Sequence, residues 1–236
     1  MSSTRTPFDE ELSRLRTHVL AMGETLDHML DLSMQALTGQ DPELTKAVLA
    51  ADDEVDRLDA EIEADCLRMI ALQQPVASDL RKLGTAFKVV TDLERIGDYA
   101  VDIAKIGRRI SRRGLFYKPL VDMPRLAGLV RAMLRDVMSA FVNQDLDVVA
   151  RVVTADDEVD DLYHRYRDFV IEAMRQDTTQ VYVGTFVVLA AKYLERVGDH
   201  LVNVAERIHY MVTGDLVQLA KQRKLSAQSE QATGQA

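Results

Sequence analysis

The chain has 236 residues, a formal net charge of −9 and 47% hydrophobic residues. That length provides a core that needs no disulfide support, and the single cysteine, Cys66, excludes a disulfide framework. The acidic balance argues against a nucleic-acid backbone as partner, since such binding requires clustered Lys and Arg. No stretch reaches the ~18 uncharged apolar residues of a membrane-spanning helix, and the N-terminal residues lack the plan of a secretory signal. We therefore expect a cytoplasmic protein.

Three helices are predicted in the first half of the chain. Glycine and proline are few, with 11 and 5 copies, which favours long helices. Apolar residues recur in steps of three and four from Leu15 onward, which predicts a helix over 9–37. The second helix is predicted to start after Asp41, an N-cap residue that is followed by proline, and to end before Pro75. The third is predicted over 79–112.

Three more helices are predicted in the second half, after a linker over 114–121. The starts carry cap-like residues at Asp122, Asp145 and Asp177, and the last helix ends near Gly214. The domain boundaries that follow are 8–113 for the first unit and 122–214 for the second. Residues 215–236 are predicted to form a partly disordered tail, because their end is small and polar.

An internal repeat relates the two halves. The six residues from Ala51 to Asp56 recur unchanged from Ala155 to Asp160, an offset of 104. The sequence Leu-Glu-Arg-Ile-Gly-Asp over 93–98 recurs with one change over 194–199, an offset of 101. Short loops place successive helices antiparallel, so the fold class is all-α, with two tandem antiparallel three-helix bundles related by the repeat.

The repeated motifs bring carboxylates together. In an antiparallel hairpin that turns at Pro75, residues at one level have numbers averaging 75, as Asp52 and Asp98 do, and as Asp56 and Glu94 do. The corresponding pairs of the second half average 177.5, at the predicted turn, although that hairpin is three residues shorter. Eight acids are therefore predicted to form two metal-binding clusters: Asp52, Asp56, Glu94, Asp98, Asp156, Asp160, Glu195 and Asp199.

Four apposed acids cannot all remain ionised unless a cation compensates them or some of their pKa values rise. Carboxylate ligands suit hard ions. The alternative is a solvated acidic face on which Arg95 or Arg196 forms the ion pairs. Gly97 and Gly198 lie inside the predicted helices, where glycine costs ~1 kcal/mol; this indicates close approach of a neighbour or a bound ion, or simply close helix packing.

These motifs, with the segment Gln-Pro-Val-Ala-Ser-Asp-Leu-Arg over 74–81, strongly resemble the PhoU family of phosphate-signalling regulators, from about Phe8 to Gly214. The resemblance implies multinuclear iron on the eight acids, with manganese, magnesium, zinc or calcium as alternatives. It also implies negative regulation of phosphate uptake and of the phosphate-starvation response, through the ATPase subunit of a phosphate ABC transporter and a sensor histidine kinase. A homodimer is expected. At the next helical turn, Asn203 stands where the first half has Asp102, so a ligand role there would differ between the halves.

Two other functions remain open on the sequence alone. A metal-free helical adaptor would use its acidic faces to bind a basic partner. A carboxylate-bridged metallo-oxidase would need two Glu-x-x-His segments, and the chain offers only Glu206 with His209. No enzyme motif is present, so we expect a binding protein rather than a catalyst.

One basic group stands out in this acidic chain. Arg108, Arg109, Arg112 and Arg113 lie at the predicted end of the third helix, where cations stabilise the helix dipole. An anionic patch on a partner is the alternative reading. No basic anion pocket is evident from the sequence, so we expect phosphate status to reach the protein through its partners.

Overall fold

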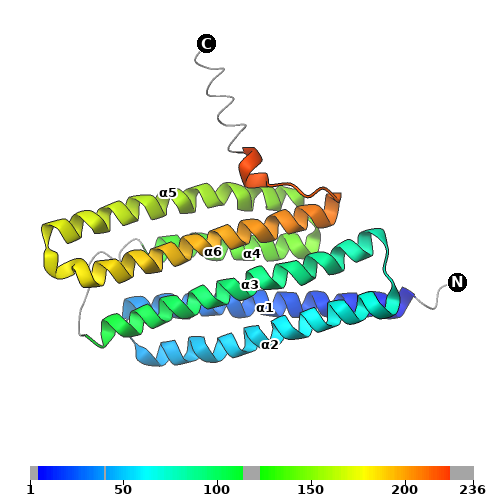
Figure 1. Cartoon of the computed structure of the whole chain (residues 1–236), viewed down its shortest axis with the longest axis horizontal. Helices are drawn as coiled ribbons and strands as arrows, with labels where there is room; N and C mark the ends of the chain where they lie inside the picture. The colour runs from blue at the N-terminus through cyan, green and yellow to red at the C-terminus, as the bar shows by residue number, and fades with distance from the viewer. Residues whose placement is uncertain (1–4, 40, 114–122, 224–236) are drawn as a thin grey trace, which may run out of the picture.

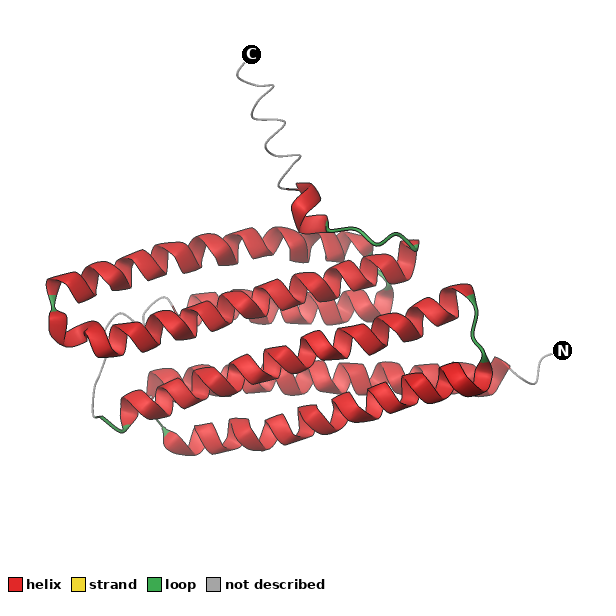
Figure 2. Ribbon diagram, in the orientation of Figure 1, coloured by secondary structure: helices red, strands yellow, loops and turns green. Residues whose placement is uncertain are grey.

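The computed structural model describes residues 5–39, 41–113 and 123–223, and these form six long helices (Figure 1). The helices are α1 (Arg5–Gly39), α2 (Pro42–Gln73), α3 (Ala77–Ser111), α4 (Met123–Asn143), α5 (Leu146–Gln176) and α6 (Val181–Thr213). A 3-10 turn, η2 (Thr178–Gln180), precedes α6. Within the described ranges there is no strand (Figure 2). The predicted linker over 114–121 lies outside the described residues.

The helix starts follow the predicted capping chemistry. Asp41 accepts a hydrogen bond from the amide of Glu43, and Asp145 accepts from the amides of Asp147 and Val148. These side chains satisfy amides that have no partner inside the helix. Because each carboxylate also lies at the positive end of a helix dipole, the caps define where α2 and α5 begin.

Each half of the chain is a three-helix bundle. Helices α1, α2 and α3 pack on one another, and so do α4, α5 and α6, with their axes nearly aligned (Figure 1). The predicted apolar seam of α1 is buried, with Leu15, Val19 and Leu26 at most 1% exposed. Cys66 is also part of the core, where burial raises the pKa of its thiol to about 12. The predicted all-α, two-bundle fold is confirmed.

The two bundles pack together chiefly through α3 and α6, which run antiparallel. His200 Nδ1 lies 2.8 Å from Asp92 Oδ1, and the Asn203 amide donates to the same oxygen at 3.2 Å. The repeat offset of 101 maps Asp92 onto Tyr193 and Asn203 onto Asp102, and this second pair is also in contact, since the Tyr193 hydroxyl is hydrogen-bonded to Asp102. The interface is therefore approximately two-fold symmetric within one chain.

A second contact between the bundles joins α1 to α4. Arg131 binds Asp27 with both arms of its guanidinium, Nε donating to Oδ1 at 2.8 Å and Nη2 to Oδ2 at 3.0 Å. The bidentate hydrogen bonds to Arg131 lower the pKa of Asp27. This pair fixes the relative position of the two bundles on the side away from α3 and α6.

The start of the predicted tail lies against the second bundle. Leu219 and Ala220 are partly buried on its core, and Arg223 forms a 2.5 Å ion pair with Asp157 of α5. Residues 224–236 are outside the described part of the chain. None of the described helices has an apolar stretch that is long enough to cross a lipid bilayer.

Candidate metal-binding carboxylate sites

The first bundle brings the predicted acids of α2 and α3 face to face. The charges of Asp56 and Asp98 both act on Asp52, and the charge of Asp56 reaches Glu94. These are the neighbours that a hairpin turning at Pro75 predicts, so the register of α2 against α3 is confirmed. Asp52 and Asp98 also share a groove of about 300 Å³ with Asp102.

The first site is an energetically unfavourable place for negative charge. Burial, followed by the charges of Asp56 and Asp98, raises the pKa of Asp52. Burial, followed by the charge of Asp98, likewise raises the pKa of Glu94. Both effects favour the protonated carboxyl, so a cation at this position would relieve them.

Asp59 belongs to this site and was missed in the sequence. It lies on α2 one turn beyond Asp56, and its pKa is raised by burial and then by the charges of Glu63 and Asp56. Its Oδ1 atom is buried without a hydrogen-bond partner among the described residues. The spacing of 52, 56 and 59 on one helical face was the available signal, but Asp59 has no acidic counterpart in the second copy of the motif.

Glycine at positions 97 and 198 makes room for a carboxylate of the preceding helix. A Cβ at Gly97 would lie 3.3 Å from Asp52 Oδ1, and a Cβ at Gly198 would lie 2.8 Å from Asp156 Oδ1. A carboxylate that is a predicted site residue therefore lies beside each glycine, and so does a valine of the helix that carries that carboxylate, Val55 or Val159 at 3.5 Å, so close helix packing is observed as well. The glycines let α2 approach α3, and α5 approach α6, at the level of the acids.

In the second bundle, α5 supplies Asp156 and Asp160 and α6 supplies Glu195 and Asp199. Asp156 and Glu195 are 7% and 8% exposed, so this site is more enclosed than the first. Asp156, Asp160 and Asp199 line a common groove of about 390 Å³. Glu195 does not line that groove, and Lys192 donates to both of its oxygens at 2.5 Å.

Arginine pairs with part of each acidic group, as the alternative reading predicts. Arg95 lies 2.9 Å from Asp98 and 3.5 Å from Glu94, and Arg196 lies 3.6 Å from Asp199. By contrast, no cationic side chain in the described part of the chain lies within ion-pair distance of Asp52. Arg95 and Arg196 therefore compensate acids of α3 and α6, while Asp52 is compensated only at longer range, by the charge of Lys105.

The residues of the next turn line the same grooves as the acids but have partners at the bundle interface. Asp102 pairs with Lys105 at 3.5 Å and accepts from Tyr193, and Asn203 donates to Asp92 across the bundle interface. Asp102 and Asn203 thus make their contacts where α3 packs on α6. Neither of them is one of the four predicted acids of its bundle.

The carboxylate oxygens are suitable ligands for a hard cation, but the structure does not arrange them around a common point. Carboxylate oxygens alone suit magnesium, manganese, calcium or iron. Within the described ranges, however, no group of three or more His, Cys, Asp or Glu side chains is arranged to hold a metal ion. The carboxylates face one another without converging on one point, and the metal role of the eight acids stays a prediction.

The single Glu-x-x-His segment, Glu206 to His209, contacts the residues that follow α6. Burial raises the pKa of Glu206, and the amides of Ala220 and Leu219 donate to its carboxylate. His209 Nδ1 lies 3.4 Å from the carbonyl oxygen of Asp215. Both residues thus anchor the segment that follows α6.

Comparison with known proteins places the chain in a family. The sequence profile of the PhoU domain matches twice, over residues 19–107 and 123–208. The chain belongs to the PhoU family. Each match spans one bundle and includes the four predicted acids of that bundle.

Relatives of the same family match almost the whole chain. A phosphate-specific transport system accessory protein PhoU homolog of Clostridium acetobutylicum is 38% identical over 92% of this chain and 99% of its own. A homolog of the same description from Deinococcus radiodurans is 33% identical over 89% of this chain and 98% of its own. The crystal structure of PhoU from Pseudomonas aeruginosa superposes with a TM-score of 0.84 and 32% identity, over 88% of this chain and all of that one. Membership of this family supports a role of the chain in a phosphate transport system rather than in catalysis.

Proposed function

We propose that this protein restrains phosphate uptake and the phosphate-starvation response when phosphate is plentiful. It does so by contact with the ATPase subunit of a phosphate ABC transporter and with a sensor histidine kinase, and it works in the cytoplasm as a homodimer. The observation that carries the proposal is the match of both bundles to the PhoU domain. The relatives named as accessory proteins of phosphate-specific transport support it.

The regulatory part of the proposal is tested in cells. Deletion of the gene should raise expression of phosphate-starvation genes in medium with excess phosphate, and the intact gene on a plasmid should restore repression. Unchanged expression in the deletion strain would refute the regulatory role.

Direct contact is tested by calorimetry with each purified partner, and the absence of heat at tens of micromolar for both would refute the contacts.

We further propose that the carboxylate sites bind hard metal ions, with multinuclear iron as the first candidate and manganese, magnesium, zinc or calcium as the others. The raised pKa values of Asp52 and Glu94 support this, because a cation would relieve the burial and repulsion that cause them. The ligands would be the four acids of each bundle, with Asp59 as an added candidate. Metal analysis of the purified protein, compared with Glu94→Ala/Asp98→Ala, tests it.

A metal-free adaptor is the second candidate. The ion pairs of Arg95 and Lys192 with site acids favour it, because they compensate part of the charge without an ion. The two candidates differ in one measurement. If the native protein carries no ion and chelators leave its melting temperature unchanged, the adaptor is correct and the metal proposal fails.

A further inference from the structure

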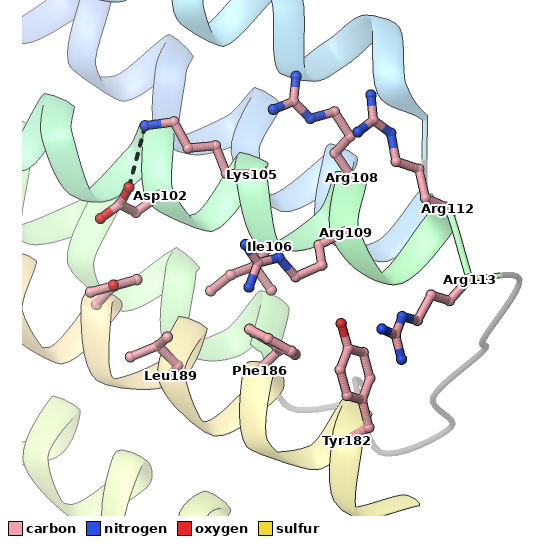
Figure 3. Close-up of a pocket in the computed structure, with 11 residues that line it drawn as sticks. Asp102, Lys105, Ile106, Arg108, Arg109, Arg112, Arg113, Tyr182, Phe186 and Leu189 are labelled. Carbon is pink, nitrogen blue, oxygen red and sulfur yellow. Dashed lines mark ion pairs between the residues drawn. The ribbon is translucent and has the colours of Figure 1, made fainter.

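A basic groove lies between the end of α3 and the beginning of α6 (Figure 3), and none of the eight acids lines it. It has a volume of about 700 Å³. One wall carries Arg108, Arg109, Arg112 and Arg113 of α3 and the residues just after it, and the other wall belongs to the second bundle. The sequence alone did not indicate that these arginines line a groove.

The second wall of the groove is aromatic. The guanidinium of Arg109 lies over the ring of Phe186 at 4.9 Å, and that of Arg113 lies over the ring of Tyr182 at 4.0 Å. Figure 3 shows both arginines directed across the groove toward these rings. Such stacking uses the face of a guanidinium and leaves the N–H groups at its edge available to oxyanions.

The positive charge of the groove is not neutralised within the described residues. No described carboxylate lies within ion-pair distance of the four arginines, whereas Lys105 at the inner end is paired with Asp102 at 3.5 Å. Arg108 and Arg112 are four residues apart on the helix, as are Arg109 and Arg113, and like charges at this spacing repel. An anion in the groove would remove that repulsion.

Stabilisation of the helix dipole does not explain this arrangement. The dipole favours cations in the last turn, which holds Arg108 and Arg109, while Arg112 and Arg113 follow that turn. The repeat supplies a control, because α6 ends at the equivalent level of the other bundle. The equivalents of the four arginines there are His209, Tyr210, Thr213 and Gly214, so the fold does not require arginine at this place.

We propose that this groove binds a chain of phosphoryl groups, either as an inorganic polyphosphate or as the phosphates of a nucleoside triphosphate. Arginine edges match phosphate oxygens in pairs. Arg109 and Arg113 lie over the aromatic wall, and Arg108 and Arg112 extend from the other side of α3 but still line the groove, so the positive charge is spread over a length that suits several linked anionic groups better than one. The volume falls in the range of small-molecule sites, ~300–1,000 Å³, so the groove alone is far smaller than a protein interface. This site does not depend on the carboxylates or on the proposed partners.

The test is calorimetry of the full-length protein in EDTA, so that metal bound at the acids cannot bridge to phosphate. Tripolyphosphate and ATP should both bind, and Arg109→Ala/Arg113→Ala should weaken each at least ~10-fold, because two charge-assisted contacts are lost. The control Arg14→Ala/Arg175→Ala removes the same charge from side chains that are 66% and 77% exposed outside the groove, and it should bind like the native protein. Circular dichroism confirms that both variants are folded.

The probes also distinguish the two sources. Equal affinities for ATP and tripolyphosphate would support an inorganic chain, and tighter binding of ATP would support a nucleotide whose base contacts the aromatic wall. Orthophosphate or a glutamate-rich peptide that binds as tightly as tripolyphosphate would overturn the proposal, since a phosphate chain would then have no advantage. Equal binding by the native protein and Arg109→Ala/Arg113→Ala would overturn the location.

Discussion

In the first bundle no described cation lies within ion-pair distance of Asp52, on which the charge of Lys105 acts only at longer range, whereas in the second bundle Lys192 holds both oxygens of Glu195. The same motif letters therefore stand in two different electrostatic settings. The difference arises at one position, because the repeat offset of 101 aligns Lys192 with Thr91. A repeated acidic motif thus need not produce two equivalent sites, since the residue one turn before a carboxylate can supply it with a cation.

The largest expected effect separates the two sites by metal binding. Manganese at a hundred times its Kd should stabilise the folded chain by ~2.7 kcal/mol, a rise in Tm of about 5–10 °C. Asp52→Asn/Asp98→Asn should remove more of this rise than Asp156→Asn/Asp199→Asn. The reason is that the second site must first displace Lys192 from Glu195.

Thermal unfolding with manganese and with EDTA measures this difference. Asp9→Asn/Asp215→Asn is the control, because it removes the same charge from two exposed acids outside the predicted ligand set. If manganese does not raise the Tm of the native protein, the predicted difference between the sites fails. If Asp156→Asn/Asp199→Asn removes more of the rise than Asp52→Asn/Asp98→Asn, the order of the two sites is the reverse of the prediction.

The next effect concerns the lysine itself. Lys192→Met should destabilise the fold by ~1–2 kcal/mol in EDTA, because it leaves the buried carboxylate of Glu195 without its cation. Urea unfolding provides the measurement. Lys46→Met is a matched control, since Lys46 pairs with Glu43 at the same spacing but both side chains are about 70% exposed. It should change stability by less than ~0.5 kcal/mol, and an equal loss in both variants would contradict the role of burial.

A smaller effect follows from the raised pKa of Asp52. A carboxyl with a raised pKa in the folded state contributes stability at pH values below its unfolded pKa, and this contribution is lost as pH rises through the folded pKa. In EDTA at pH 7, Asp52→Asn should therefore stabilise the chain, by less than ~1 kcal/mol because the group is partly exposed. The gain should vanish below the ordinary pKa of 3.8.

Unfolding free energies between pH 3 and pH 7 test that sign. Asp27→Asn should behave in the opposite way and destabilise the chain at pH 7, since its hydrogen bonds with Arg131 lower the pKa of Asp27. A loss of stability from both substitutions at pH 7 would show that Asp52 is not under electrostatic strain. Repeating the measurement with manganese should reverse the effect of Asp52→Asn if Asp52 is a ligand.

The smallest expected effect comes from a substitution that makes the first site resemble the second. Thr91→Lys places an ammonium three residues before Glu94, as Lys192 stands before Glu195, and should stabilise the fold by ~0.2–0.5 kcal/mol in EDTA. It should also lower the pKa of Glu94 and weaken manganese binding. Thr91→Met controls for the longer side chain. Unchanged metal affinity in Thr91→Lys would mean that the lysine does not distinguish the sites.

Several features of the fold could be predicted because they depend on local pattern. The apolar steps in α1, the caps at Asp41 and Asp145 and the turn before Pro75 each involve residues within a few positions of one another. The register of α2 against α3 could be predicted for the same reason, since a short turn ties two antiparallel helices to one level. That register places Asp52 beside Asp98, as the structure shows.

The features that were missed depend on contacts between distant segments. The repeat reveals that α3 and α6 are equivalent, but nothing local indicates that they pack antiparallel, with Asp92 against His200. The basic groove has the same origin, because Arg113 and Tyr182 lie far apart in the sequence and meet only when the bundles pack. Asp59 could not be found from the repeat, because its equivalent in the second half is Tyr163.

By itself the sequence determined two three-helix bundles, the apposition of acids within each bundle and membership of a phosphate-transport family. The physical reason is that helix periodicity, capping and short hairpins act over a few residues and leave readable spacing. Only the tertiary structure decided which acids are compensated by Arg95 and Lys192, and which face of one bundle meets the other. Those outcomes depend on side-chain direction and long-range packing, where one residue such as Thr91 or Lys192 changes the charge balance without changing the fold.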